Sequence, residues 1–125
     1  MTIRVLVLLT VADQASFMAG RKPNNIIEHA FESLAQVNAY RDGIDAIADE
    51  SDEVGEILVV ESSVLYEIDG QREEVTFSTT DQASAFQQGL EDAEGFASPL
   101  IVTEDDDNFD KLAALLAQRD STANK

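Results

Sequence analysis

The sequence predicts an α+β fold, in which strands form a sheet and helices cover it. Short apolar runs rich in β-branched residues, such as Ile3–Val11, alternate along the chain with apolar stripes at helical spacing, such as Ala83–Leu90. The turn signal Asp69-Gly70 lies between two stretches with strand character. The strands and helices also alternate within one chain of ordinary domain length, which predicts a layered domain with a shared core.

The amino-terminal third is expected to form a strand, a loop and a helix. The run Ile3–Val11 is apolar almost throughout, which predicts a central strand covered on both faces. Residues 13–23 are expected to form a loop. Asn24 or Asn25 can cap a helix that reaches about Ala39. The apolar stripe of this helix would consist of Ile27, Ala30, Phe31 and Leu34.

A break and a second group of strands follow this helix. Asp42-Gly43 is expected to end it, and a short helical stretch would precede Gly55. The apolar segment 57–68 is interrupted by Ser62-Ser63, so the sequence leaves open whether it forms one strand or two.

A hairpin at Asp69-Gly70 is the most specific structural signal in the chain. A two-residue loop there places Glu67 opposite Arg72 and Val64 opposite Val75. The opposite charges of Glu67 and Arg72 would then attract each other across the two strands, which supports this register.

The last third of the chain predicts a helix, a strand and another helix. Thr79 and Gln82 have the spacing of a capping box, and Gly95 is a natural stop for the helix that follows. Residues 99–103 form a short apolar run, which predicts a strand. The stripe of the last helix would consist of Phe109, Leu112, Ala113 and Leu116.

The order of these elements matches the split β-α-β-β-α-β arrangement, the ferredoxin-like fold, with an extra helix at the carboxyl end. That fold has one antiparallel sheet with helices on one face. If Ser62-Ser63 separates two strands, the sheet would instead have five strands and mixed directions. In either case we expect a single domain over residues 1–120, with 121–125 as a frayed tail.

The charge of the chain restricts its partners. The 125 residues include 25 Asp and Glu but only 8 Lys and Arg, which gives a net charge of -17. Affinity for nucleic acids depends on cationic contacts to phosphate, so direct binding to nucleic acid is not expected, and neither is binding to an anionic membrane. The apolar run Val5–Ala12 is far shorter than a membrane span. The chain has no cysteine, which fits a reducing compartment, and we expect a soluble protein of the cytoplasm.

The sequence contains no pattern that indicates catalysis. Cysteine is absent, and His29, the one histidine, is expected on the flank of a helix without catalytic partners. A calcium loop counted from Asp105 would have Asp110 at its glycine position and Leu116 at its closing glutamate position, so that pattern fails. We therefore expect no enzyme activity, no cofactor and no metal.

The acidic residues are unevenly distributed, and their clustering suggests a binding face. The first 27 residues contain only Asp13, whereas two later segments are dense in acids. The main candidates for a face that binds a basic protein surface are Asp42, Asp45, Asp49, Glu50, Asp52, Glu53 and Glu56. The second candidates are Glu104, Asp105, Asp106 and Asp107, for which capping of the last helix is the competing interpretation.

Two accounts of this acidity remain open. Carboxylates can imitate phosphates and occupy the basic groove of a nucleic-acid-binding protein, as in inhibitors encoded by phages. Alternatively, the acidity is an adaptation to a salty solvent, and the chain is a small assembly or regulatory module. Such a module could form a homodimer through an exposed hairpin edge around Tyr66 and Val75.

One segment resembles a known group of proteins. Asn24-Asn25-Ile26-Ile27-Glu28-His29-Ala30-Phe31-Glu32-Ser33-Leu34 is similar to a helix of a phage antirestriction protein that mimics DNA. The resemblance covers 11 of 125 residues and consists mostly of ordinary amphipathic-helix composition. The known mimic is helical, whereas this chain encodes strands, so we do not assign it to that group.

Overall fold

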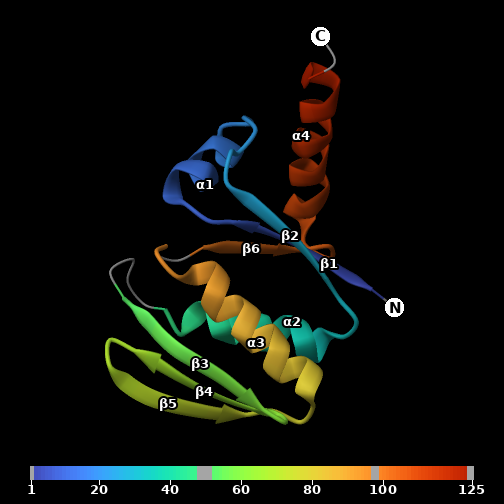
Figure 1. The fold of residues 1–125 in the computed structure, drawn as a ribbon. Helices are drawn as coiled ribbons and strands as arrows, with labels where there is room; N and C mark the ends of the chain where they lie inside the picture. Colours follow the sequence, from blue (N-terminus) through green and yellow to red (C-terminus); the bar gives the residue numbers. More distant parts are fainter. Residues whose placement is uncertain (1, 48–51, 97–98, 124–125) are drawn as a thin grey trace.

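The computed structural model describes residues 2–47, 52–96 and 99–123, with side chains of the last helix described as far as Leu116. Within these residues the chain is α+β, with four helices and two separate antiparallel sheets of three strands each. The elements stack in four layers (Figure 1): a pair of helices, the first sheet, a second pair of helices, and the second sheet.

The first sheet, sheet A, contains β1 (Ile3–Leu8), β2 (Ile26–Phe31) and β6 (Leu100–Thr103) in the order β2-β1-β6. β1 is central, and its last four residues, Val5–Leu8, are 0% exposed. Val5 and Val7 face one helical layer, whereas Leu6 and Leu8 face the other. The prediction of a central strand covered on both faces is therefore confirmed, although the strand ends at Leu8.

The second sheet, sheet B, is a meander of β3 (Val54–Val60), β4 (Ser63–Ile68) and β5 (Gln71–Thr76). The predicted hairpin register is confirmed: Glu67 pairs with Arg72 and Val64 pairs with Val75. A turn at Glu61 and Ser62 separates β3 from β4, which answers the question of one strand or two.

Two helices, α2 (Leu34–Asp45) and α3 (Thr80–Ala93), lie between the sheets (Figure 1). They cross at Gly43 and Gly89, where the backbones approach so closely that a Cβ on either glycine would lie 2.2 Å from a carbonyl oxygen of the other helix. Gly43 was predicted to end a helix, but it lies within α2 as the contact point for α3. One hydrophobic cluster joins both sheets through this layer, from Val5 in β1 to Val64 in β4.

The other two helices, α1 (Val11–Met18) and α4 (Asp107–Ala123), cover the opposite face of sheet A. Phe17 of α1 and Leu112 of α4 form a second cluster there with Leu6 and Leu8. Thr10 caps α1 by accepting a hydrogen bond from the backbone N–H of Asp13 at 3.0 Å. Residues 13–23 were predicted to form a loop, but residues 13–18 belong to α1.

The predicted sheet arrangement is wrong, because the strands form two sheets. The split ferredoxin-like order is not found, and neither is the five-stranded mixed sheet. Helices were expected on one face, yet sheet A carries helices on both of its faces. The physical reason is that the meander Val54–Thr76 pairs only with itself and packs its inner face on α2 and α3.

The helix predicted to follow Asn24 or Asn25 and to reach about Ala39 is also wrong in its first half. Ile26–Phe31 is strand β2, and α2 begins only after Ser33, whose side chain and Gln36 form a capping box. Ile27 and Phe31 are four residues apart, a spacing that places two side chains on one face of a helix and equally on one face of a strand. The likeness of this segment to a helix of a DNA mimic is therefore not structural.

Candidate binding surface

The outer face of sheet B carries exposed apolar side chains. The inner face packs Ile57, Val59 and Tyr66 against the helical layer, and no described element covers the other side (Figure 1). Leu58, Val60 and Leu65 are 51%, 48% and 38% exposed. Leu58 and Leu65 are paired across β3 and β4, so these side chains form a continuous patch and not isolated surface residues.

Charged side chains adjoin this patch where β3 bulges. The register shifts between Val54 and Ile57, so that Gly55 and Glu56 together stand opposite Glu67. Gly55 leaves space for Glu67, since a Cβ there would lie 2.8 Å from Oε2 of that side chain. The Nε of Arg72 lies 3.2 Å from Oε1 of Glu67.

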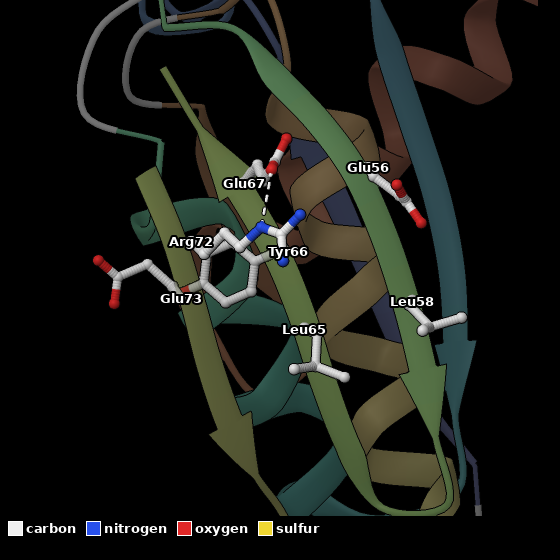
Figure 2. A pocket seen from close by; sticks show the side chains of 7 residues that line it. All are labelled: Glu56, Leu58, Leu65, Tyr66, Glu67, Arg72 and Glu73. Carbon is white, nitrogen blue, oxygen red and sulfur yellow. Dashed lines mark hydrogen bonds and ion pairs between the residues drawn. The ribbon is translucent and has the colours of Figure 1, made fainter. Parts of the chain in front are cut away.

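A shallow groove of about 170 Å³ joins the apolar patch to these charges (Figure 2). Its lining is formed by Glu56, Leu58, Leu65, Tyr66, Glu67, Arg72 and Glu73. Glu56 and Glu67 thus stand on this face with one guanidinium, which is already paired with Glu67. Glu73 pairs with Tyr66 across β4 and β5, so its side chain is on the opposite face. The chemistry of this groove is therefore apolar surface beside the exposed carboxylate of Glu56.

The acidic segment that begins with Asp42 lies at one end of the molecule. Asp42 and Asp45 are exposed on the last turns of α2, and Asp52 and Glu53 lead into β3. The β4–β5 turn is tied to the same place, because the backbone N–H of Glu53 donates to the Asp69 carboxylate at 2.9 Å. Glu56 follows in the bulge. Two other predicted residues of this cluster, Asp49 and Glu50, lie outside the described residues.

The second predicted cluster lies elsewhere, at the junction of β6 and α4 (Figure 1). The Asp106 carboxylate accepts a hydrogen bond from the backbone N–H of Asn108 at 2.8 Å, and the Thr103 hydroxyl donates to Asp105. These contacts favour the capping interpretation for this run. Glu104 and Asp107 are exposed. The structure therefore does not bring the two acidic clusters onto one face.

A polar network around Asp92 was missed by the sequence reasoning. His29 lies in β2, and its Nε2 is 2.7 Å from Oδ2 of Asp92 in α3. Tyr40 of α2 donates to the same oxygen at 2.7 Å, and Gln88 donates to Oδ1 at 2.8 Å. The network ties β2 and α2 to α3, which brings Asp92 to residues 63 and 52 positions earlier in the chain, so no local pattern could have revealed it.

The network stabilises the ionised form of its carboxylate. Burial by itself raises the pKa of Asp92, but the hydrogen bonds from His29, Tyr40 and Gln88 outweigh burial and hold that pKa below its usual range. Burial, with Asp92 beside it, raises the pKa of the Tyr40 hydroxyl far above its usual value. An ionised Asp92 and a neutral Tyr40 form a closed set of partners, as expected of a structural tie.

A Ser-His-Asp triad of Ser84, His29 and Asp92 does not fit the geometry. Ser84 lines the hollow next to His29 and is the obvious nucleophile to test. It precedes Asp92 by eight positions on the same helix, which corresponds to about 12 Å along the axis. One imidazole ring cannot contact both side chains over that distance, so this arrangement is not a Ser-His-Asp triad.

A second buried acid, Asp13, has a structural role. The side chain is 3% exposed, and its Oδ1 accepts the backbone N–H groups of Asn24 and Asn25 at 3.0 and 3.1 Å. Burial raises the pKa of Asp13, but hydrogen bonds from Thr10, Asn25 and Asn24 together lower it below its usual range. The spacing of Thr10 and Asp13 is a capping signal that the sequence could have supplied.

Comparison with protein families, curated proteins and solved structures finds no match. Among the described residues, no group of acidic or histidine side chains is arranged to hold a metal ion. The helices of the described chain are also too short or too polar to span a bilayer. The candidate surface must therefore be interpreted from its own chemistry.

Proposed function

We propose that this protein is a non-catalytic binding protein that engages a basic surface of another protein. The proposed contact region, called here the acidic end, comprises Asp42, Asp45, Asp52, Glu53 and Glu56. Asp49 and Glu50 belong to the same proposed set but lie outside the described residues. The observation that carries the proposal is that α2, the start of β3 and the β4–β5 turn bring acids from separate segments to one end of the molecule.

Electrostatics supports this proposal. A concentration of like charge raises the local concentration of an oppositely charged partner and speeds encounter, and salt weakens both effects. Arg41 and Arg72 are the described cations in the elements of the acidic end, and Arg72 is paired with Glu67. An inhibitor that imitates nucleic acid is one form of this function, because the partner's groove would then be basic by necessity.

The test compares two triple variants with the parent protein. The first variant, Asp42→Asn with Asp45→Asn and Glu53→Gln, removes three charges from the acidic end. The control variant, Glu104→Gln with Asp107→Asn and Asp110→Asn, removes the same charge near α4. Partners are captured on immobilised protein at low and at molar salt, identified by mass spectrometry, and their affinities are then measured with purified components.

The expected result is a nucleic-acid-binding or otherwise basic partner that the parent and control retain and the first variant loses. High salt should release that partner. Equal binding by both variants would show that total charge, and not the acidic end, attracts the partner, and the proposed site would be wrong. Circular dichroism on each variant separates loss of binding from loss of folding.

A second candidate function is supported by the second acidic run. Glu104 to Asp107 lie away from the acidic end, so acidity is not confined to one region (Figure 1). On this account the chain is a small assembly or regulatory module of a salt-adapted organism, and its charge keeps the surface hydrated. Thermal unfolding across salt concentrations tests it: a melting temperature that does not rise toward molar salt rejects salt adaptation.

A further inference from the structure

The two edges of sheet B differ in their chemistry. β5 begins Gln71-Arg72-Glu73-Glu74, and such charged residues discourage another strand from pairing. β3 contains four consecutive apolar residues, Ile57–Val60, without lysine or proline. Both strands are unpaired on their outer sides within the described chain, because the sheet order is β3-β4-β5. One edge is protected, and the other is open to a further strand.

The open edge adjoins the exposed apolar patch. Leu58 and Val60 lie on β3 itself, and Leu65 is directly across from Leu58 on β4. Figure 2 shows Leu58 and Leu65 on the uncovered face, with Glu56 further along β3 and Glu67 beside Arg72. A strand added along Ile57–Val60 would place alternate side chains over this patch and beside Glu56.

Charge decides which kind of strand can occupy the edge. Two copies of this chain would each bring a net charge of -17. The antiparallel register that aligns Ile57–Val60 of both copies also places Glu56 of each copy opposite Glu61 of the other. Like charges directly opposite each other destabilise a strand pair, so a second copy is disfavoured. A segment that presents apolar residues and a lysine or arginine on the same strand face has the complementary pattern.

We propose that β3 accepts an extended segment of a basic partner as a fourth strand of sheet B. Backbone hydrogen bonds along Ile57–Val60 would hold the segment, its apolar side chains would cover Leu58 and Leu65, and its cations would face Glu56. This inference rests on the proposed function for the charge of the partner, but it assigns the contact to the sheet edge. The acidic end then steers the partner, and the edge holds it.

The experiment uses a labelled synthetic peptide, with fluorescence anisotropy as the readout. Every second residue, on the strand face that covers the patch, is valine, except for lysine at the end beside Glu56, and the residues between are threonine. Two further peptides carry the same side chains but are N-methylated at either the odd or the even positions. In a strand, N–H groups of alternate residues point to opposite sides, so pairing with β3 requires one methylated peptide to lose affinity by about tenfold or more while the other keeps it. The same peptide with glutamate in place of lysine should not bind.

Protein variants locate the contact. Leu58→Lys places a cation on the open edge and should weaken binding of the parent peptide by about tenfold or more. Leu100→Lys, at an exposed leucine of β6 in sheet A, is the matched control and should leave the affinity unchanged. Hydrogen exchange should show new amide protection at Ile57–Val60 when the peptide binds.

Three outcomes would overturn the inference. Both methylated peptides could bind as well as the parent, the peptide could leave exchange at Ile57–Val60 unchanged, or the free protein could sediment as a dimer whose formation Leu58→Lys abolishes. The last result would assign the edge to a second copy. None of these outcomes depends on Asp42, Asp45 or Glu53, so the variants of the acidic end still test the proposed function separately.

Discussion

Sheets A and B are both antiparallel and three-stranded, yet they use their faces differently. In sheet A, the central residues Val5–Leu8 are 0% exposed, because helices cover both sides. In sheet B, the helical layer covers one side, and Leu58 and Val60 remain about half exposed on the other. The comparison separates apolar residues that the fold requires from apolar residues that the fold leaves available.

The number of helices explains this difference. An apolar sheet face is shielded from water when a helical layer packs on it, and the four helices of the described residues supply two such layers. α1 with α4 covers sheet A alone, whereas α2 with α3 serves both sheets. The outer face of sheet B receives no helix in the described chain. The apolar side chains on this face therefore contribute little to the stability of the fold. Contact with a partner would explain their presence better than folding does.

The largest effect should come from truncating equivalent leucines in the two sheets. Leu6→Ala removes a fully buried side chain between β1 and α4 and should lower the free energy of unfolding by about 2–5 kcal/mol. Leu58→Ala removes a side chain that is 51% exposed and should change it by less than about 0.5 kcal/mol. Urea unfolding followed by circular dichroism measures both. Equal losses would show that sheet B has a covered face, and the comparison would fail.

The next effect concerns the helical layer that the two sheets share. Gly89→Ala places a Cβ 2.2 Å from the carbonyl oxygen of Tyr40, so α2 and α3 must separate. Backbone atoms cannot yield as a flexible side chain can, and we expect a loss of about 3 kcal/mol, at the upper end for overpacking. Gly70→Ala has no such contact, although its backbone has a positive φ of 81°, and serves as the comparison.

Both sheets should respond to Gly89→Ala together, because one core cluster runs from Val5 through the helices to Val64. Hydrogen exchange can resolve amides of β1 and β4 in the same sample. Loss of protection in β4 alone would mean that sheet A and its outer helices are stable without the shared layer.

The sequence predicted local features of this fold better than the assembly of its parts. The β1 strand, the β4–β5 hairpin and the start of α3 at Thr79 follow from patterns within a few residues. Division into two sheets does not, because nothing in β3 or β6 states which strand each will pair with. The Ile26–Phe31 segment failed because its four-residue apolar spacing fits a helix and a strand equally well.

The candidate site was predictable only in its charge. The positions of the acids in the sequence showed that they cluster between Asp42 and Glu56. The structure adds the bulge that sets Glu56 beside Glu67. Exposure of Leu58 could not be foreseen, because an apolar strand residue is buried or exposed according to what packs on its face. The Asp92 network depends on contacts between β2, α2 and α3, which no local pattern encodes.

The smallest predicted effect tests the polar tie between sheet A and the helical layer. Asp92 joins β2 to the helical layer, and its lowered pKa means that the folded state binds a proton there less readily than the unfolded state. Its contribution to stability is present above the usual carboxyl pKa of 3.8 and is lost as pH falls through the lower folded value. Asp92→Asn should therefore reduce stability by about 1–2 kcal/mol at neutral pH, and by less in strong acid.

Urea unfolding at several pH values below and above 3.8 measures this difference. Tyr40→Phe keeps the carboxylate but removes one of its donors, so its curve should lie between those of the parent and Asp92→Asn. The prediction would be contradicted if the free energies of unfolding of the parent and of Asp92→Asn differed by the same amount at every pH. It would mean that Asp92 stabilises the fold through packing and not through its charge. The contact between β2 and α3 would then be of the same kind as the apolar contact between sheet B and these helices.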